Sequence, residues 1–464
     1  MTADAAALYR PQTILFVASR ASIGGGEVYL FDVLSHLDRS RFTPIVAIPK
    51  LGPLGERLAA LGVETLVLDA EYGWLKPPQA WYEFLSGYEH RVRHIVDFIV
   101  ERKIDLVHTN SNQVFEGAVA ARLAGVHHVH VVHIPFQAHL PIYQRMPVGA
   151  TSFARWVDEL SSAIVAVAEP VAASLCPPAR RDKVHVIHNG LDLDRYRGAR
   201  AAATGRIRRE LGIPADAPLV TGVGRLHPDK GFEHFIDAAA QVAAALPGSR
   251  FVIAGGADSA EHEQALKARI LAQGLEGVVQ LLGFRHDVLE LLAESDVFLL
   301  TSHSEGGPYV LIEAVATGCG VVATRCGGFV EHVVRPGQTG LLCEPGDSSG
   351  AAQAVLVLLR DRPAMARQVQ AAQAIVFAGE FDVRVSVGRL VQVYEQVLAT
   401  PAPAAGSAGL TLLLQMTHEL GTLGSELTDL KERMKRVERA ADLVLDNPVS
   451  ALARRLVRGS GGND

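Results

Sequence analysis

Residues 302–323, SHSEGGPYVLIEAVATGCGVVA, carry the strongest fold signal in the chain. An apolar strand is predicted just before them, over 297–301, and a helix within them, over 309–317. Pro308 suits the first helical position because its missing N–H would be unpaired there, and Gly318 suits the residue after the last turn. The stretch therefore predicts a helix N-terminus at the carboxyl end of a strand.

The loop and helix of this stretch have the residues of a diphosphate site. Gly306 and Gly307 let the backbone approach a ligand closely, and a helix N-terminus offers free N–H groups and a positive dipole end. Glu305 stands in the same loop. Glu313 lies among apolar residues of the helix, and a half-buried carboxylate needs donors, which a ribose diol would supply. Taken alone, Glu313 is better explained as a favourable charge in the first half of a helix.

A second loop has a similar character. Residues 222–231, GVGRLHPDKG, follow a predicted strand and lead into a helix. Arg225 offers a bidentate fork and Lys230 a point charge, a combination that suits a diphosphate. Either cation alone could belong to a solvated turn.

Outward from these loops, short apolar strands alternate with helical patterns in two series. The first series is predicted at 13–19, 44–48, 64–68, 106–109, 129–133, 164–168 and 184–187, and the second at 219–223, 250–254, 278–282, 297–301 and 321–324. Such alternation predicts parallel sheets with helices on both faces, and ligands bind at the carboxyl ends of the strands. The fold class is therefore α/β, with two doubly wound units facing a cleft.

Length and composition limit the possible functions. A chain of 464 residues predicts two or three domains, and a net charge of -6 lacks the basic footprint of a nucleic-acid-binding protein. The start shows no secretory signal, and no apolar run reaches the ~18 residues of a membrane span. We expect a cytoplasmic protein. Peripheral contact with the inner face of the membrane remains an open alternative. Four cysteines are interpreted as small buried residues: Cys176, Cys319, Cys326 and Cys343.

The motifs, taken as one ordered set over about residues 13 to 398, resemble glycosyltransferase family 4, a family of retaining enzymes with the GT-B fold. The residues that carry the resemblance are Glu305 with Glu313, Gly224-Arg225-Leu226 with Lys230-Gly231, Glu313-Ala314 followed by Gly318 and Val321-Val322-Ala323, Asn189-Gly190, Gly24-Gly25-Gly26-Glu27, and His133. The resemblance implies a nucleotide-diphosphate sugar as donor, a glycan or lipid-linked acceptor, and a context such as surface polysaccharide biosynthesis.

The resemblance also implies roles on the C-terminal side. Arg225 and Lys230 would hold the donor diphosphate, Glu313 would bind the ribose hydroxyls, and Glu305 would sit beside the transferring sugar. Further donor-binding positions are Gly224, Gly306, Gly307, the backbone N–H groups of Tyr309 and Val310, and the base-contacting loop at Phe284 and Arg285. Gly307 replaces a frequent aromatic residue of the family, which leaves the grip on the sugar in question.

On the N-terminal side, the resemblance implies that Gly25 and Gly26 let the first loop approach the diphosphate and acceptor. His133 would touch the sugar. We interpret the other strand histidines, His127, His128 and His130, as ordinary polar or core residues, although four histidines could also suggest a metal site.

No essential metal or other cofactor is expected. Asp192-Leu193-Asp194 spells the D-x-D motif that binds metal in glycosyltransferases of the GT-A fold, but here it starts the interdomain connector. Helix capping is the preferred interpretation of these two aspartates.

These inferences divide the chain as follows: an acceptor-side domain, 1–195, to which a helix at about 380–398 returns; a nucleotide-sugar-binding domain, 196–379; a linker, 400–410; a coiled-coil helix, 411–446; and a basic tail, 447–464. The coiled coil rests on heptad positions held by Leu413, Leu420, Leu427, Met434 and Ala441, and by Met416, Leu423, Leu430, Val437 and Val444. It predicts a parallel homodimer. The alternatives are a helix folded back on its own chain, or one lying on a membrane.

Two other functions remain open from the sequence. A nucleotide-sugar epimerase can use the same fold, and a sugar-nucleotide-binding scaffold would need no catalysis. The first would produce an epimer without an acceptor, and the second would bind donor without turnover. Intact Glu305, Arg225 and Lys230 favour transfer over the scaffold.

Overall fold

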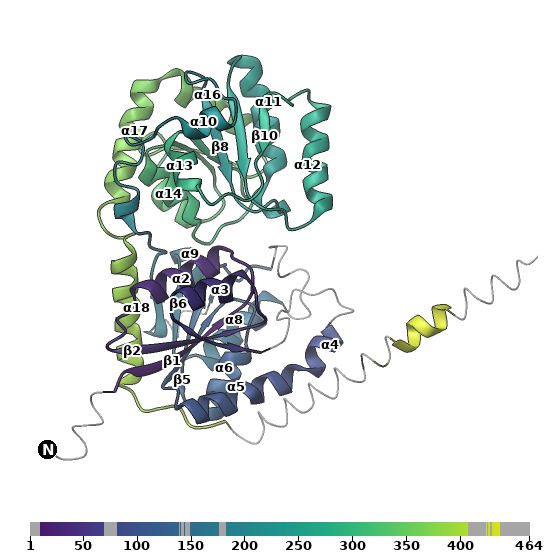
Figure 1. Cartoon of the computed structure of the whole chain (residues 1–464), viewed down its shortest axis with the longest axis vertical. Coiled ribbons are helices and arrows are strands. Elements are labelled where there is room, and N and C mark those ends of the chain that lie inside the picture. The colour runs from purple at the N-terminus through teal and green to yellow at the C-terminus, as the bar shows by residue number, and fades with distance from the viewer. Residues whose placement is uncertain are drawn as a thin grey trace, which may run out of the picture.

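The computed structural model describes residues 10–68, 81–138, 140, 143, 149–175, 182–406, 424, 426 and 429–436. Two α/β units lie one above the other (Figure 1). The first has a seven-stranded parallel sheet in the order β3-β2-β1-β4-β5-β6-β7, and the second a six-stranded parallel sheet in the order β10-β9-β8-β11-β12-β13. This is the predicted fold class.

The N-terminal unit holds the first series of strands. They are β1 (Gln12–Ala18), β2 (Phe42–Ile48), β3 (Glu64–Val67), β4 (Leu106–Asn110), β5 (His127–Val132), β6 (Ala163–Ala166) and β7 (Val184–Val186). The helices are α2 (Gly25–His36), α3 (Pro53–Ala60), α4 (Trp81–Ser86), α5 (Tyr88–Arg102), α6 (Glu116–Ala124), α8 (Ala150–Leu160) and α9 (Glu169–Leu175). Apolar runs such as Ile14–Ala18 are fully buried between the helical layers, as a parallel sheet requires.

The C-terminal unit holds the second series. Its strands are β8 (Leu219–Val223), β9 (Arg250–Ala254), β10 (Val279–Leu281), β11 (Val297–Leu300), β12 (Gly320–Thr324) and β13 (Leu341–Cys343). Its helices are α10 (Arg206–Glu210), α11 (Phe232–Ala245), α12 (Ala260–Ala272), α13 (Val288–Ala293), α14 (Tyr309–Thr317), α15 (Gly328–Val333), α16 (Ser348–Arg360) and α17 (Arg362–Val376), with short 3-10 turns η3 (Leu193–Arg195) and η4 (Pro228–Lys230). The sequence did not predict β13, which has only three residues and so too little periodicity to recognise.

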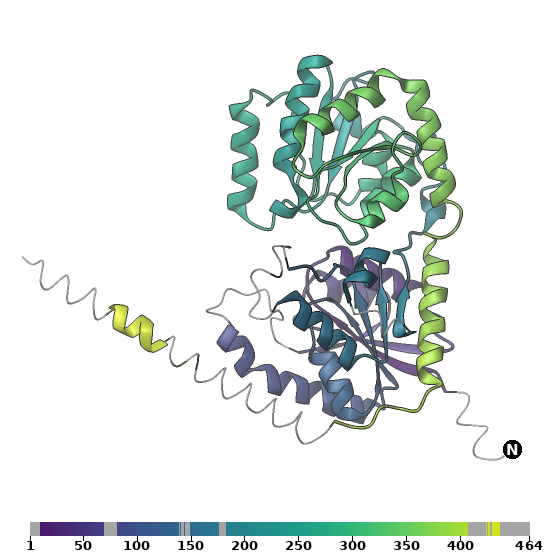
Figure 2. The same ribbon diagram turned by 180° about the vertical axis from the view of Figure 1, so that it is seen from behind.

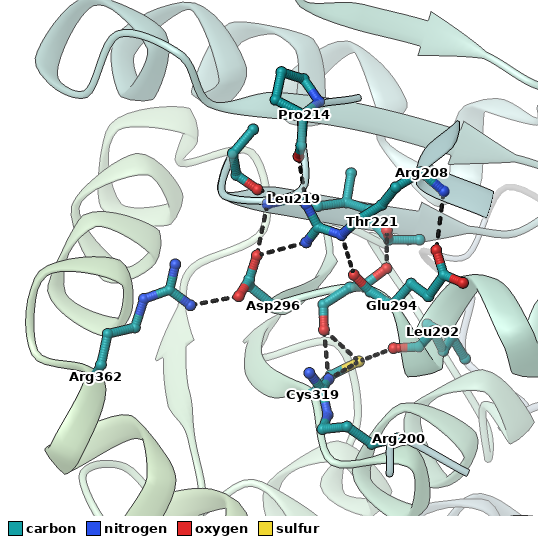
Figure 3. A network of polar contacts seen from close by, with 12 residues as sticks. Arg200, Arg208, Pro214, Leu219, Thr221, Leu292, Glu294, Asp296, Cys319 and Arg362 are labelled. Atoms are coloured by element: carbon teal, nitrogen blue, oxygen red, sulfur yellow. Dashed lines mark hydrogen bonds and ion pairs between the residues drawn. The ribbon is translucent and has the colours of Figure 1, made fainter. Parts of the chain in front are cut away.

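The arginine-rich connector before β8 is bound to the C-terminal unit by a polar network (Figure 3). Arg208 Nη2 lies 3.1 Å from Asp296 Oδ2, and its backbone N–H donates to Glu294 Oε2 at 2.9 Å. Asp296 also accepts from the backbone N–H of Leu219 at 2.8 Å. The connector is therefore anchored beside the first strand of the second sheet.

The chain returns to the N-terminal unit through α18 (Val383–Leu398), the long helix at the side of both views (Figures 1 and 2). This helix packs against α2, β5 and β6. Buried Tyr394 and His108 share a hydrogen bond of 2.6 Å between the phenol oxygen and Nδ1. The two segments that cross between the units, one before η3 and one before α18, lie side by side: the backbone N–H of Leu191 donates to the carbonyl of Phe381 at 2.8 Å.

The predicted coiled coil, 411–446, lies outside the described residues except for 424, 426 and 429–436, which are helical. The homodimer therefore stays a prediction. Within the described part of the chain, no helix combines the length and apolarity that crossing a membrane requires. Cys319, Cys326 and Cys343 are buried and free, as predicted, whereas Cys176 lies outside the described residues.

Candidate functional site

A cavity of about 420 Å³ lies between the two units and is lined by loops at the carboxyl ends of strands from both sheets. We call its two sides the N-terminal wall and the C-terminal wall. The N-terminal wall is formed by Ser19, Arg20, Gly24–Val28, Asn110–Gln113, His133 and Ile134, and the C-terminal wall by Val223–Arg225, Lys230, Glu305–Val310 and Glu313. The fold thus brings most of the predicted site residues to one cavity.

On the C-terminal wall, Lys230 and Glu305 form an ion pair. Lys230 Nζ donates to Glu305 Oε1 at 2.5 Å, and the hydroxyl of Ser302 donates to the same oxygen at 2.6 Å. The backbone carbonyl of Lys230 accepts from Thr301 Oγ1 at 3.0 Å, which fixes the turn η4 against the end of β11. Thr301 and Ser302, which directly follow β11, therefore position both Lys230 and Glu305.

Arg225 lies at the border of a second, adjoining cavity of about 360 Å³, which is also lined by Gly224, Phe284 and Arg285. Its guanidinium is paired with Asp258. Phe284 is 63% exposed, so its ring is free to cover a planar ligand.

Arg285 lines the same cavity, but its guanidinium is held by carboxylates. It donates to Asp287 at 2.8 Å and to Glu210 at 2.7 Å. These hydrogen bonds raise the pKa of Arg285. The loop is where the prediction placed it, yet Phe284 is better placed than Arg285 to meet a base.

Helix α14 directs its N-terminus at the cavity, with Tyr309 and Val310 in the first turn. The first N–H groups of a helix have no intrahelical acceptor, so this end can bind an anion. The helix is as predicted, except that Pro308 occupies the N-cap and Tyr309 is the first helical residue.

Glu313, one and a half turns along α14, lines the cavity with its carboxylate. Burial raises the pKa of Glu313, and a hydrogen bond from the hydroxyl of Tyr196 to Oε1, at 2.8 Å, opposes that shift. A ribose diol would offer two further donors to this carboxylate. Tyr196 was not singled out from the sequence because it lies in the connector, 117 residues from Glu313.

Gly306 and Gly307 lie where the two units touch, a role that the sequence did not show. A side chain at Gly306 would place its Cβ 1.7 Å from the carbonyl oxygen of His133. The carbonyl of Gly307 accepts a hydrogen bond of 2.7 Å from Asn189 Nδ2. The loop that carries Glu305 is therefore held directly against the N-terminal unit.

On the N-terminal wall, the glycine loop and His133 are joined by Asn110. Its Nδ2 donates to the carbonyl of Gly26 at 2.7 Å, and its Oδ1 lies 2.8 Å from His133 Nε2. Because Oδ1 can only accept, His133 Nε2 must carry the proton and Nδ1 must be an acceptor. Burial lowers the pKa of His133 to about 4, so the ring is neutral at neutral pH. No described heavy atom lies within 4 Å of a Cβ built on Gly25, so ligands can approach its backbone.

Two further residues near this wall were missed by sequence analysis. Asn112 Oδ1 accepts from the backbone N–H of His133 at 2.8 Å, which fixes the loop after β5. Asp32, on α2, has its pKa raised to about 7 by burial and then by the negative charge of Glu313. Residues 107–113, VHTNSNQ, form no recognisable motif, so only the sheet order brings Asn112 to the cavity.

The interpretation of Asp192 and Asp194 as helix-capping residues was wrong. Asp192 occupies the N-cap of η3, but its side chain makes no capping hydrogen bond. Both carboxylates instead accept from Arg384 Nη2, at 2.9 and 2.6 Å. Because Arg384 of α18 binds both carboxylates, Asp192 and Asp194 fix the connector to α18 at the junction between the units.

The strand histidines are structural, as predicted. His128 Nε2 lies 2.8 Å from Thr109 Oγ1, and His130 Nε2 lies 2.6 Å from the carbonyl of Ser111. Burial lowers the pKa of both rings. His127 lies 3.2 Å from the carbonyl of Thr400, at the far end of the sheet from the cavity.

Comparison with known proteins agrees with this geometry. Residues 23–195 match the family described as "Glycosyltransferase Family 4", and residues 204–375 match "Glycosyl transferases group 1". The D-inositol 3-phosphate glycosyltransferase of Thermomonospora curvata is 30% identical over 405 residues, which is 76% of this chain and 91% of that protein. The chain belongs to glycosyltransferase family 4 and is a GT-B glycosyltransferase.

Other matches are shorter or rest on structure. A D-inositol 3-phosphate glycosyltransferase of Geodermatophilus obscurus is 33% identical over 277 residues, but the match spans only 56% of this chain and 59% of that protein. The crystal structure of HepE from Anabaena in complex with UDP superposes with a TM-score of 0.69 at 25% sequence identity. The match covers 83% of this chain and 100% of the Anabaena chain.

Proposed function

We propose that this glycosyltransferase moves a hexosyl group from a uridine diphosphate sugar to a hydroxyl of a glycan or lipid-linked acceptor, with retention of anomeric configuration. The uridine assignment is supported by the Anabaena protein, which has been crystallised with UDP and with UDP-glucose. The retaining outcome is implied by family 4.

The observation that carries this proposal is the convergence of anion-binding groups on one cavity. Arg225 and Lys230 come from the loop between β8 and α11, the N-terminus of α14 follows the loop after β11, and all three line the same cavity. Glu313 lies beside them, where a ribose would follow the diphosphate. A charged clamp with an adjacent buried carboxylate suits a nucleoside diphosphate better than a neutral ligand.

The reaction we propose breaks the bond between the anomeric carbon and the diphosphate oxygen, and forms a bond from that carbon to the acceptor oxygen on the same face. The acceptor's proton goes to the departing diphosphate. Lys230, Arg225 and the α14 N-terminus stabilise the charge that develops on this leaving group. Because these groups supply positive charge, we propose that transfer needs no metal ion.

The N-terminal wall would orient the sugar and acceptor. His133 Nδ1 can accept a hydrogen bond from a sugar hydroxyl, since Nε2 is committed to Asn110. Gly25 and Gly26 leave room for an acceptor hydroxyl next to the anomeric carbon. Contact of Gly306 with the His133 loop would help to keep water away from the donor.

A donor screen tests the proposal. Thermal shifts should be measured with UDP, GDP and ADP, followed by transfer assays with the matching sugars. A ligand at ~100 times its dissociation constant stabilises by about 2.7 kcal/mol, so the preferred nucleotide should be evident. The proposal predicts the largest shift with UDP and slow release of UDP from a UDP-sugar. An epimeric sugar formed without acceptor would identify an epimerase instead.

A further inference from the structure

Two histidines and a glutamate meet at the junction where the chain crosses between the two units. His188 follows β7, His332 lies on α15, and Glu380 precedes α18. One ligand atom of each lies within 4.8 Å of the others. None of these residues lines the donor cavity, so the proposed transfer reaction does not use them.

The spacing of these atoms suits a small tetrahedral cation. His188 Nδ1 lies 3.7 Å from Glu380 Oε1, and His332 Nε2 lies 3.3 Å from Glu380 Oε2. Zinc–nitrogen bonds of about 2.0–2.1 Å place neighbouring tetrahedral ligands about 3.3 Å apart. The three side chains are therefore close to the separation that a bound ion would require.

His188 provides independent support because its Nδ1 is buried and unsatisfied. The residue is only 8% exposed, and Nδ1 makes no hydrogen bond to any part of the chain that the structure describes. Its ring packs against those of Phe329 and Phe381, with centroid separations of 5.5 and 5.6 Å. A buried nitrogen of this kind costs free energy unless it gains a partner.

We propose that His188, His332 and Glu380 form a binding site for a transition-metal dication of the zinc type, with water in the open coordination position. Imidazole and carboxylate together suit Zn²⁺ and Co²⁺, whereas Mg²⁺ prefers oxygen ligands alone. The 38% and 37% side-chain exposures of His332 and Glu380 leave the ion a path from solvent.

A bound ion would link three segments that meet at the junction. The segment after β7 and the segment before α18 already run together, since Leu191 and Asp382 form a β-bridge and Ser386 Oγ donates to the carbonyl of His188 at 2.9 Å. The ion would add α15 of the C-terminal unit to this pair. Because it lies outside the donor cavity, it would stabilise the arrangement of the units without joining the reaction.

A second group, Glu233, His234 and His303, has similar spacing and serves as a built-in comparison. Its carboxylate lies 3.9 Å from His234 Nε2 and 3.8 Å from His303 Nε2. The His303 side chain is 41% exposed, and no histidine of this group is buried. We therefore expect tight binding at the junction and not here.

The test uses the full-length chain purified without a histidine tag. Zinc binding is measured by equilibrium dialysis, and Co²⁺ coordination by its visible absorption bands. His332→Gln and Glu380→Gln remove one ligand each at partly exposed positions, so the fold should survive. His303→Gln is the matched control in the second group.

We expect one ion per wild-type chain, with the intense visible bands of low-coordinate Co²⁺. Binding should weaken at least about tenfold in His332→Gln and in Glu380→Gln, and remain unchanged in His303→Gln. Zinc should raise the Tm of the wild type more than that of either junction variant. Absence of stoichiometric binding by the wild type, or bands that persist in both junction variants, would overturn the proposal. Loss confined to His303→Gln would also overturn it, because it would place the ion in the second group.

Discussion

The two walls of the cavity differ in how they are built. The C-terminal wall has charged groups: Lys230 and Glu305 stand in the loops that follow β8 and β11, and Glu313 stands on α14, the helix after β11. The N-terminal wall is mostly neutral at its centre, where glycine backbone, Asn110 and the uncharged ring of His133 are joined by hydrogen bonds. This contrast suggests that one wall binds the donor by charge and the other orients the reacting groups.

The largest effect is expected from removing a cation of the C-terminal wall. Lys230→Ala should lower kcat/KM by about a hundredfold, because a charge-assisted contact to the diphosphate strengthens as the bond breaks. Steady-state kinetics with the preferred donor would measure this. Lys267→Ala is the control, since Lys267 pairs with Glu263 on α12, outside the cavity. Equal kinetics in the two variants would remove Lys230 from the site.

Glu313→Gln should act mainly on donor affinity. The substitution keeps the volume of the side chain but replaces a charged acceptor, so UDP should bind about tenfold more weakly. Isothermal titration with UDP would detect the change, and Glu331→Gln on α15 offers a control carboxylate outside the cavity. If UDP binds Glu313→Gln as tightly as the wild type, Glu313 is only a partner for Tyr196.

A smaller and different effect is expected on the N-terminal wall. Asn110→Ala frees both the Gly26 carbonyl and His133 Nε2, and a neutral hydrogen bond contributes about 1 kcal/mol. Turnover should therefore fall about fivefold, while UDP affinity stays the same. A parallel loss of UDP affinity would show that the walls do not divide the work in this way.

The pH dependence of stability tests the environment of Asp32, whose pKa is also raised by the negative charge of Glu313 on the C-terminal wall. The pKa of Asp32 is raised from 3.8 to about 7, first by burial, so the folded state binds this proton more tightly than the unfolded state. The stabilisation from this group is complete below about pH 4 and is lost as the pH rises through about 7. Asp32→Asn should flatten the fall of Tm across this range. Asp38→Asn should not, because hydrogen bonds from Ser40 lower the pKa of Asp38.

The same contrast explains what the sequence could and could not predict. Both sheets and the loops of Arg225, Lys230 and Glu305 were predictable, because each combines a buried apolar run with residues next to it in the chain. Asn110 and Tyr196 were not predictable, because strand order brings Asn110 to the cavity and the connector brings Tyr196 to Glu313.

One error and one omission have the same origin. Asp192 and Asp194 were assigned from local spacing, whereas their partner Arg384 lies 192 and 190 residues further along the chain. Gly306 was correctly placed in the site, but its close contact with His133 belongs to the packing of one unit on the other.

The central claim, that the C-terminal wall holds a diphosphate by charge, is tested most directly by comparing UDP with UMP. Isothermal titration should be performed with both ligands on the wild type and on an Arg225→Ala, Lys230→Ala double variant. We predict that the wild type binds UDP at least about tenfold more tightly than UMP, and that this preference disappears in the double variant. Equal affinity of the wild type for UDP and UMP, or a preference that survives in the double variant, would contradict the account.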